Sequence, residues 1–290
     1  MTAGMAESNL YQGFAKPMSP GEFERLSEFI RSQCGIKMPP GKKVMLEARL
    51  QKRLRTLGFT TFRQYCEHLF DERDGCEEIV HFINAVTTNK TDFFREPQHF
   101  TVLTDTILPE YLDAEGTGRN FRVWSAGCST GEEPYTIAMV LSEFGALHPG
   151  FKFSILATDI STKVLDKAKQ AIYDQERVVT VPPALKQKYL MRSRDRDRSL
   201  VRIVPELRAA VQFEQVNLMG EDLRLSEPLD VIFCRNVIIY FERHNQELLL
   251  RRLSHCLKPG GYLFLGHSET VHGFDLPLVR VTSTVYRKAV

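Results

Sequence analysis

The chain has no two cysteines spaced as a C-x-x-C pair. It contains six cysteines in all, namely Cys34, Cys66, Cys76, Cys128, Cys234 and Cys256. Such scattered positions fit neither a zinc knuckle nor the disulfide framework of a small secreted protein. We therefore expect reduced thiols that lie mostly in the core, and no bound metal.

Long apolar runs are also missing. No stretch approaches the roughly 20 apolar residues that a membrane helix needs. The first residues, MTAGMAESNLYQGFAKP, carry neither the basic nor the apolar segment of a secretory signal. The net charge is only +2, too small to indicate a nucleic-acid partner by itself. We expect a cytoplasmic protein with no nucleic-acid partner and no membrane insertion.

The sequence does contain a core-forming composition and a helical first region. Its 290 residues are 43% hydrophobic, which is enough for two domains. Ser19-Pro20-Gly21-Glu22 has the arrangement of a capping box, and Gly35 is a suitable stop for the helix that begins there. Further helices are predicted over 42–57, 61–70 and 77–86, and no strand before Phe121. We predict a flexible tail over 1–17, a helical domain over 18–88, and a linker and helix over 89–118.

The second of these helices, GKKVMLEARLQKRLRTLG, is strongly basic. It sets six cations against the single Glu47: Lys42, Lys43, Arg49, Lys52, Arg53 and Arg55. One interpretation is a solvated face that keeps the domain soluble. The other is a docking face for an acidic partner, which would relieve the repulsion between like charges.

Strands and helices alternate from Phe121 onward. Strands are predicted near 121–125, 153–158, 211–216, 229–234 and 261–266, with helices near 133–145, 161–170 and 242–257. This alternation is typical of a parallel, doubly wound sheet in an α/β domain, here over 119–290.

An irregular segment interrupts the alternation at about 173–213. It ends in an alternating Val201/Ile203 pattern, which predicts a small antiparallel β insertion. Residues 186–208 hold eight Lys or Arg against three Asp or Glu. The segment is therefore either a second basic patch or a solvated loop.

The turn after the first predicted strand, in FRVWSAGCSTGEEPY (121–135), has the small residues that let a ligand approach the backbone. It lacks both the G-x-G-x-x-G spacing and the Gly-Lys-Ser/Thr of a phosphate-binding loop. Glu132 and Glu133 would repel a pyrophosphate. A cationic nucleoside such as S-adenosylmethionine (SAM) would suit these carboxylates better.

Polar residues also follow the next strands. Asp159 lies where doubly wound folds place an acid against ribose hydroxyls, and Asn217 could present an amide to adenine. Arg235, Asn236 and Tyr240 follow the fourth strand. Tyr240 is either a core side chain or part of an acceptor pocket, and the Pro-Pro motif of many amine and base methyltransferases is absent there.

Five segments, in this order, resemble the CheR family of chemotaxis receptor glutamate methyltransferases. They are NAVTTNKTDFFRE (84–96), WSAGCSTGEEPY (124–135), ATDIS (157–161), IFCRNVIIYF (232–241) and LKPGGYLFLGHSE (257–269). The resemblance extends from about Ser19 to Tyr286. It implies a small all-α N-terminal domain followed by a Rossmann-like SAM-dependent methyltransferase domain with an antiparallel β insertion.

The resemblance also implies the reaction and its partners. The methyl group passes from SAM, leaving S-adenosylhomocysteine, to glutamate side chains on the methylation helices of chemoreceptor cytoplasmic domains. The helical domain would dock the receptor, and the insertion would bind a tethering peptide at the receptor C-terminus. The implied cofactor contacts are Asn89, Thr91, Arg95, Glu133, Asp159, Asn217, Leu218, Arg235 and Asn236.

The chemistry agrees with this interpretation. A glutamate carboxylate is already ionised at neutral pH, so its attack on a sulfonium methyl group needs no general base. Orientation of the acceptor then matters most. Arg95 has the planar fork that orients a carboxylate, and Tyr240 is the second candidate catalytic residue.

Two other function classes remain open from the sequence. One is a SAM-dependent methyltransferase of RNA or of a small molecule, which would use the basic patches on phosphates. The other is a non-catalytic regulator that binds SAM without transferring its methyl group.

Overall fold

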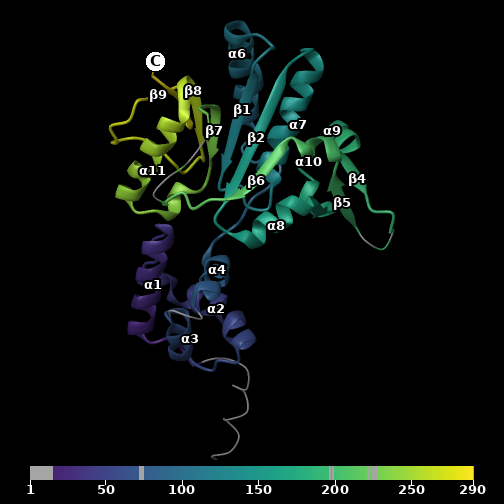
Figure 1. The fold of residues 1–290 in the computed structure, drawn as a ribbon. Coiled ribbons are helices and arrows are strands. Elements are labelled where there is room, and N and C mark those ends of the chain that lie inside the picture. Colours follow the sequence, from purple (N-terminus) through teal and green to yellow (C-terminus); the bar gives the residue numbers. More distant parts are fainter. Residues whose placement is uncertain are drawn as a thin grey trace, which may run out of the picture. The chain divides into compact units, whose positions relative to one another are not determined.

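The computed structural model describes residues 16–71, 75–195, 197, 199–220, 223 and 227–289. The chain divides into two compact units, Met1–Thr88 and Asn89–Val290 (Figure 1). Nearly all of the predicted tail over 1–17 lies outside the described residues, as does the side chain of Cys76. The other five cysteines are free thiols, as predicted. Within the described residues, no helix has the length and apolar character needed to cross a membrane.

The first unit is built from helices, as predicted. They are α1 (Pro20–Cys34), the 3₁₀ turn η1 (Pro40–Lys42), α2 (Lys43–Leu57), α3 (Phe62–Leu69) and α4 (Gly75–Val86). The capping box at the start of α1 is present: Glu22 Oε2 accepts from Ser19 N at 2.6 Å, and Ser19 Oγ accepts from Glu22 N at 3.3 Å. Gly35 ends the helix with φ 70°, a conformation that favours glycine.

Two arginines of the basic helix α2 contact other parts of the same unit. Arg53 Nε and Nη2 donate hydrogen bonds to the carboxylate of Glu78 at 2.6–2.8 Å, and the Glu78 side chain is only 2% exposed. Arg49 donates to two backbone carbonyl groups at the C-terminal end of α4. Both arginines therefore stabilise the unit itself, while Lys52 and Arg55 remain exposed on α2.

A seven-stranded sheet forms the centre of the second unit, in the order β6-β2-β1-β7-β8-β10-β9. The strands are β1 (Asn120–Ala126), β2 (Lys152–Asp159), β6 (Val211–Gln215), β7 (Leu229–Cys234), β8 (Leu257–Leu265), β9 (Leu278–Arg280) and β10 (Val285–Lys288). The five predicted strands are all present and parallel. The predicted parallel, doubly wound arrangement is confirmed for these five strands. β10 and β9, which were not predicted, add two antiparallel pairings, so the complete sheet is mixed.

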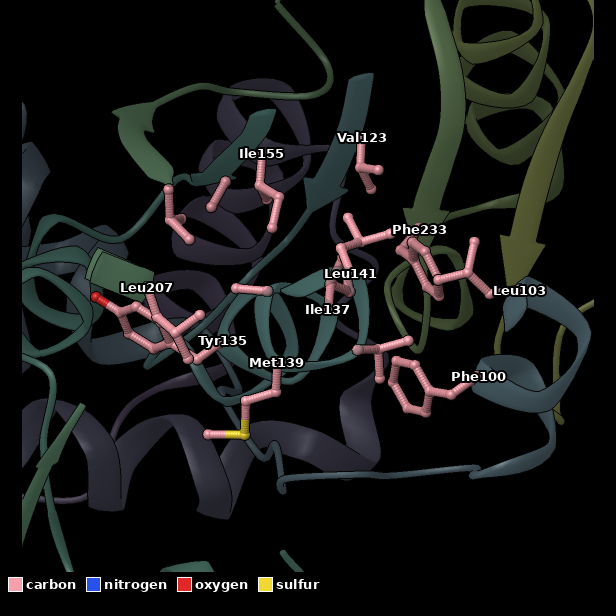
Figure 2. Close-up of a cluster of buried hydrophobic side chains, with 14 of the residues drawn as sticks. Phe100, Leu103, Val123, Tyr135, Ile137, Met139, Leu141, Ile155, Leu207 and Phe233 are labelled. Atoms are coloured by element: carbon pink, nitrogen blue, oxygen red, sulfur yellow. The ribbon is translucent and has the colours of Figure 1, made fainter. Parts of the chain in front are cut away.

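Helices cover both faces of this sheet, as a doubly wound fold requires (Figure 1). They are α5 (Gln98–Val102), the π-helical turn η2 (Leu103–Ile107), α6 (Leu108–Glu115), α7 (Glu132–Leu147), α8 (Thr162–Gln170) and α11 (Arg243–Cys256). Figure 2 shows how Ile137 and Leu141 of α7 lie among Val123 and Phe233 of the sheet and Phe100 of α5. This packing holds α7 against β1 and β7.

The predicted antiparallel insertion is a three-stranded sheet in the order β3-β5-β4. Its strands are β3 (Ile172–Asp174), β4 (Leu190–Arg192) and β5 (Leu200–Ile203), accompanied by the 3₁₀ turn η3 (Gln175–Val178), α9 (Pro183–Tyr189) and α10 (Pro205–Ala209). β6, in contrast, belongs to the seven-stranded sheet. Two residues of the basic loop between β4 and β5 lie outside the described residues.

Candidate functional site

The candidate site lies at the carboxyl ends of the parallel strands. Along the chain, β1 is followed by β2 and then β6, which lie successively farther to one side of β1 in the sheet. The chain then returns to β7, on the other side of β1, and continues to β8. The order therefore reverses between β1 and β7, which is where open α/β sheets bind ligands. The predicted site residues lie at the ends of these strands, in the loops and helical turns that follow them, or in the segment 89–96.

Two backbone contacts shape the turn after β1. The N–H groups of Gly127 and Cys128 both donate to Thr158 O at 2.8 Å. Gly127 has φ 83°, and a Cβ atom there would lie 2.6 Å from the Val237 side chain. Only glycine fits this position, so the turn can lie close against the loop after β7.

Asp159 holds this turn from the end of β2. Its carboxylate accepts hydrogen bonds from the backbone N–H groups of Ser129 and Ser161, both at 2.9 Å. The residue is 8% exposed. Burial raises its pKa, although the backbone N–H groups act in the opposite direction. A carboxylate has about four acceptor positions, so it can still accept hydrogen bonds from hydroxyl groups of a ligand.

Glu133 and Arg235 meet where β1 and β7 end. Ser125 Oγ donates to Glu133 Oε1 at 2.7 Å, and Arg235 Nη1 lies 3.5 Å from Glu133 Oε2. The Arg235 side chain is only 2% exposed. Burial raises the pKa of Glu133, and the Arg235 charge and the Ser125 hydroxyl oppose this rise. The two side chains were predicted separately, and the structure places them in contact.

The neighbouring Glu132 has a different environment from the one expected. It is 1% exposed, and its carboxylate accepts from Arg177 Nη2 and Thr130 Oγ1, both at 2.6 Å. Its charge is thus balanced by Arg177. Two carboxylates were expected to face a ligand. Glu133 contacts Arg235 at the candidate site, whereas Glu132 pairs with Arg177 of the insertion.

Residues 89–96, which we call the strap, cross the start of α7. Ser129 Oγ donates to the Asn89 carbonyl at 2.9 Å, and Arg177 donates to the Thr91 carbonyl at 2.6 Å. At the other end, Arg235 Nη2 donates to the Arg95 carbonyl. Backbone carbonyl contacts therefore bring Asn89 to the turn after β1, Thr91 to Arg177 of the insertion, and Arg95 to the loop after β7.

The last strap residue, Glu96, joins a cluster of histidines. Its Oε2 lies 3.5 Å from His99 Nδ1 and 3.8 Å from His267 Nε2. Burial, and then the nearby Arg235, lower the pKa of His99 to about 4. One carboxylate and two imidazoles are a possible metal-ligand set. Arg235 Nε, however, lies 3.4 Å from the same Glu96 oxygen, and this positive charge disfavours a second cation.

Glu269 is the main site residue that the sequence did not predict. Its carboxylate accepts from four backbone N–H groups, those of Gly266 at 2.6 Å, Asn236 and Val237 at 2.8 Å, and Ile239 at 3.3 Å. It thereby ties the loop after β7 to the end of β8. The sequence feature that could have indicated Glu269 is its position in LGHSE, where an acidic residue follows the buried strand β8.

The remaining predicted residues lie at the same edge of the sheet. Asn217 follows β6, and its Oδ1 accepts from Met219 N at 3.0 Å, so the side chain shapes its own turn. Leu218 is 8% exposed. Asn236 has φ 59°, a strained conformation that Glu269 supports through the Asn236 N–H. Tyr240 is partly buried in the 3₁₀ turn η4 (Ile238–Tyr240).

Comparison with known proteins gives matches over both units. Residues 89–287 match the family model described as "CheR methyltransferase, SAM binding domain", and residues 21–87 match "CheR methyltransferase, all-alpha domain". The chain is 40% identical over 270 residues to a chemotaxis protein methyltransferase of Borreliella burgdorferi, covering 92% of this chain and 94% of the relative. It is 40% identical over 269 residues to that of Escherichia coli, covering 93% and 91%. It is also 41% identical over 270 residues to chemotaxis protein methyltransferase 2 of Pseudomonas aeruginosa, covering 92% and 93%.

Proposed function

The chain belongs to the CheR methyltransferase family, and from that premise we propose that it is a protein-glutamate O-methyltransferase. It would use SAM to form methyl esters on glutamate side chains of chemoreceptor cytoplasmic domains during chemotactic adaptation, acting in the cytoplasm. The observation that carries this proposal is the charge balance at the carboxyl edge of the sheet.

Carboxylates outnumber guanidinium groups there. Asp159, Glu133 and Glu96 are set against Arg235 and Arg95, and burial raises the pKa of both Asp159 and Glu133. A buried carboxylate with a raised pKa gains from a cation placed beside it. SAM carries a sulfonium and an ammonium group, so its charge fits this edge whereas a pyrophosphate does not.

Other features of the site support the same cofactor. Asp159 can accept from ribose hydroxyls, and the turn after β1, with glycines at positive φ, permits close approach of a ligand to the backbone. When bound, SAM supplies a methyl group on a positively charged sulfur. The residues proposed to hold it are Asn89, Thr91, Arg95, Glu133, Asp159, Asn217, Leu218, Arg235 and Asn236.

The chain's task toward the acceptor is orientation. An ionised glutamate needs no base, and correct placement lowers the barrier by several kcal/mol in comparable reactions (about 7–11 at most). Arg95 is partly buried, and its Nη1 donates to Lys90 O at 3.2 Å within the strap. Its fork is held near Glu133 and is proposed to orient the acceptor carboxylate, with Tyr240 as a wall of the acceptor pocket.

Two surfaces are proposed to engage the receptor. On the helical unit, the exposed Lys52 and Arg55 would face acidic methylation helices. In the insertion, a pocket of about 570 Å³ lies beside the edge strand β4 and includes Leu190, Lys186 and Arg192 among its lining residues. An edge strand beside a cationic pocket suits an extended peptide with an acidic residue, such as a receptor tether.

The proposal is tested by incubating the chain with methyl-labelled SAM and chemoreceptor-containing membranes. Glutamate methyl esters are base-labile, so the expected result is label on the receptor that mild alkali releases. Label on added RNA with a strong salt dependence would favour the RNA methyltransferase instead. Tight SAM binding without any transfer to the receptor would favour the non-catalytic regulator.

A further inference from the structure

The small antiparallel insertion is joined to the candidate cofactor site by one arginine. Arg177 lies in η3, the turn that leaves β3. Its Nη2 donates to Glu132 Oε1 at the start of α7 and to the Thr91 carbonyl in the strap, both at 2.6 Å. Its Nη1 reaches Asp92 Oδ1 at 3.3 Å. A single guanidinium therefore fastens the strap to the helix that carries Glu133.

Burial makes the contact with Glu132 the dominant one. The Glu132 side chain is 2% exposed, whereas Asp92 is 43% exposed and its pairing with Arg177 is screened by water. Glu132 is otherwise held by the Thr130 hydroxyl. Loss of Arg177 would leave a buried carboxylate without its countercharge, which proteins tolerate poorly.

Two further contacts from the insertion reach the same region. Tyr173 OH donates to the Thr130 carbonyl at 2.8 Å in the turn after β1. Thr180 Oγ1 donates to the Phe93 carbonyl at 2.7 Å in the strap. Of the three, Arg177 contacts both the strap and α7. It adds to the direct hydrogen bond from Phe94 N to Thr136 Oγ1 at 3.2 Å and to the contacts of Arg235, and it is the contact through which the insertion helps to set the position of the strap on α7.

We propose that Arg177 is a positioning residue for SAM binding, through which the insertion holds the strap over the start of α7. The inference rests on the proposed function. Arg177 touches neither the cofactor nor the acceptor in this account; it acts through Thr91 and Glu132. The insertion is then part of the cofactor site, in addition to any role in receptor recognition.

The test is Arg177→Met in the full chain, compared with Arg202→Met. Arg202 is a suitable control because it is an exposed arginine of the same small sheet that donates to Gln170 O at 3.1 Å, outside the site. Calorimetry should show SAM binding weakened by about tenfold or more in Arg177→Met, since charge-assisted hydrogen bonds that order a binding segment are lost. Hydrogen exchange of the strap amides should accelerate in this variant alone.

A kinetic measurement separates positioning from general damage. In Arg177→Met, KM for SAM should rise by a similar factor, while kcat at saturating SAM stays within about twofold of wild type. Arg177→Lys should recover part of the affinity, because it keeps the charge beside Glu132 but loses the fork that also reaches Thr91.

A double variant distinguishes the loss of positioning from the effect of leaving the Glu132 charge buried without a partner. Glu132→Gln combined with Arg177→Met removes the uncompensated carboxylate, so thermal stability should return toward wild type while SAM affinity stays low. Full recovery of affinity in the double variant would overturn the proposal, as would wild-type affinity in Arg177→Met itself. If the wild-type chain bound no SAM, the proposed function would fail instead, so the two failures are distinguishable.

Discussion

Glu269→Gln tests how the loop after β7 is held in place. In the native chain, one carboxylate oxygen accepts from Val237 N and Ile239 N, and the other accepts from Asn236 N and Gly266 N. A glutamine replaces one of these oxygens by an NH₂ group, so two N–H donors lose their acceptor. A hydrogen bond to a charged group contributes about 1.5–3 kcal/mol, so the two together give about 3–6 kcal/mol.

The substitution also removes a buried charge, and this offsets part of the lost hydrogen-bond stabilisation. Burial raises the pKa of Glu269 despite its four N–H partners, because the ionised form is costly to bury. We therefore expect the lower end of the range, a fall of about 3 kcal/mol in the free energy of unfolding. Weaker SAM binding should accompany it, because the same loop carries Arg235 and Asn236.

Urea unfolding at neutral pH is the assay, with Glu247→Gln as the matched control. Glu247 lies on α11, where it forms an exposed ion pair with Arg251 at 3.1 Å. Its replacement should cost less than about 0.5 kcal/mol. If Glu269→Gln were as stable as this control, the four hydrogen bonds would not hold the loop, and the reasoning would be refuted.

Four further predictions concern the cofactor and the receptor. Asp159→Asn should weaken SAM binding by about 1.5–3 kcal/mol in calorimetry; unchanged affinity would remove Asp159 from the ribose. Arg95→Lys should reduce turnover much more than SAM affinity, whereas an equal fall in both would make Arg95 a cofactor ligand only. SAM affinity should decline as the pH falls through the raised pKa of Glu133, since the protonated acid no longer attracts a cation, and Glu133→Gln should flatten this dependence. Reversing the charges of Lys52 and Arg55 should raise KM for the receptor and weaken the salt dependence of this KM, while SAM affinity stays unchanged. Wild-type kinetics in this variant would show that the two side chains form only a solvated face.

Local patterns in the sequence predicted most of the fold. The capping box at Ser19 and the stop at Gly35 were visible because both act within one helical turn. Most of the five parallel strands were visible as apolar or alternating runs, and β7 is buried along its whole length. β6 is mostly exposed and has only a short alternation of apolar and polar residues. β9 and β10 were missed because they have only three and four residues, too few for a clear alternation.

The candidate site was predictable where a residue follows a buried strand. Asp159 and Arg235 were found in this way, because parallel strands end at one edge and bring such residues together. Contacts between distant side chains were not predictable. Arg53 was assigned to a basic face, although it pairs with Glu78, 25 positions away. Arg177 and Glu132 are separated by 45 positions, and no local pattern joins them.

Esterification of chemoreceptor glutamate side chains is the activity that we propose for this chain. The most direct test is peptide mass spectrometry of receptor-containing membranes incubated with the chain and SAM. We expect the mass of one added methyl group on receptor glutamates. It should be lost after mild alkali and absent when those glutamates are replaced by glutamine. Methylation that survives alkali, or that maps to another residue type, would contradict it.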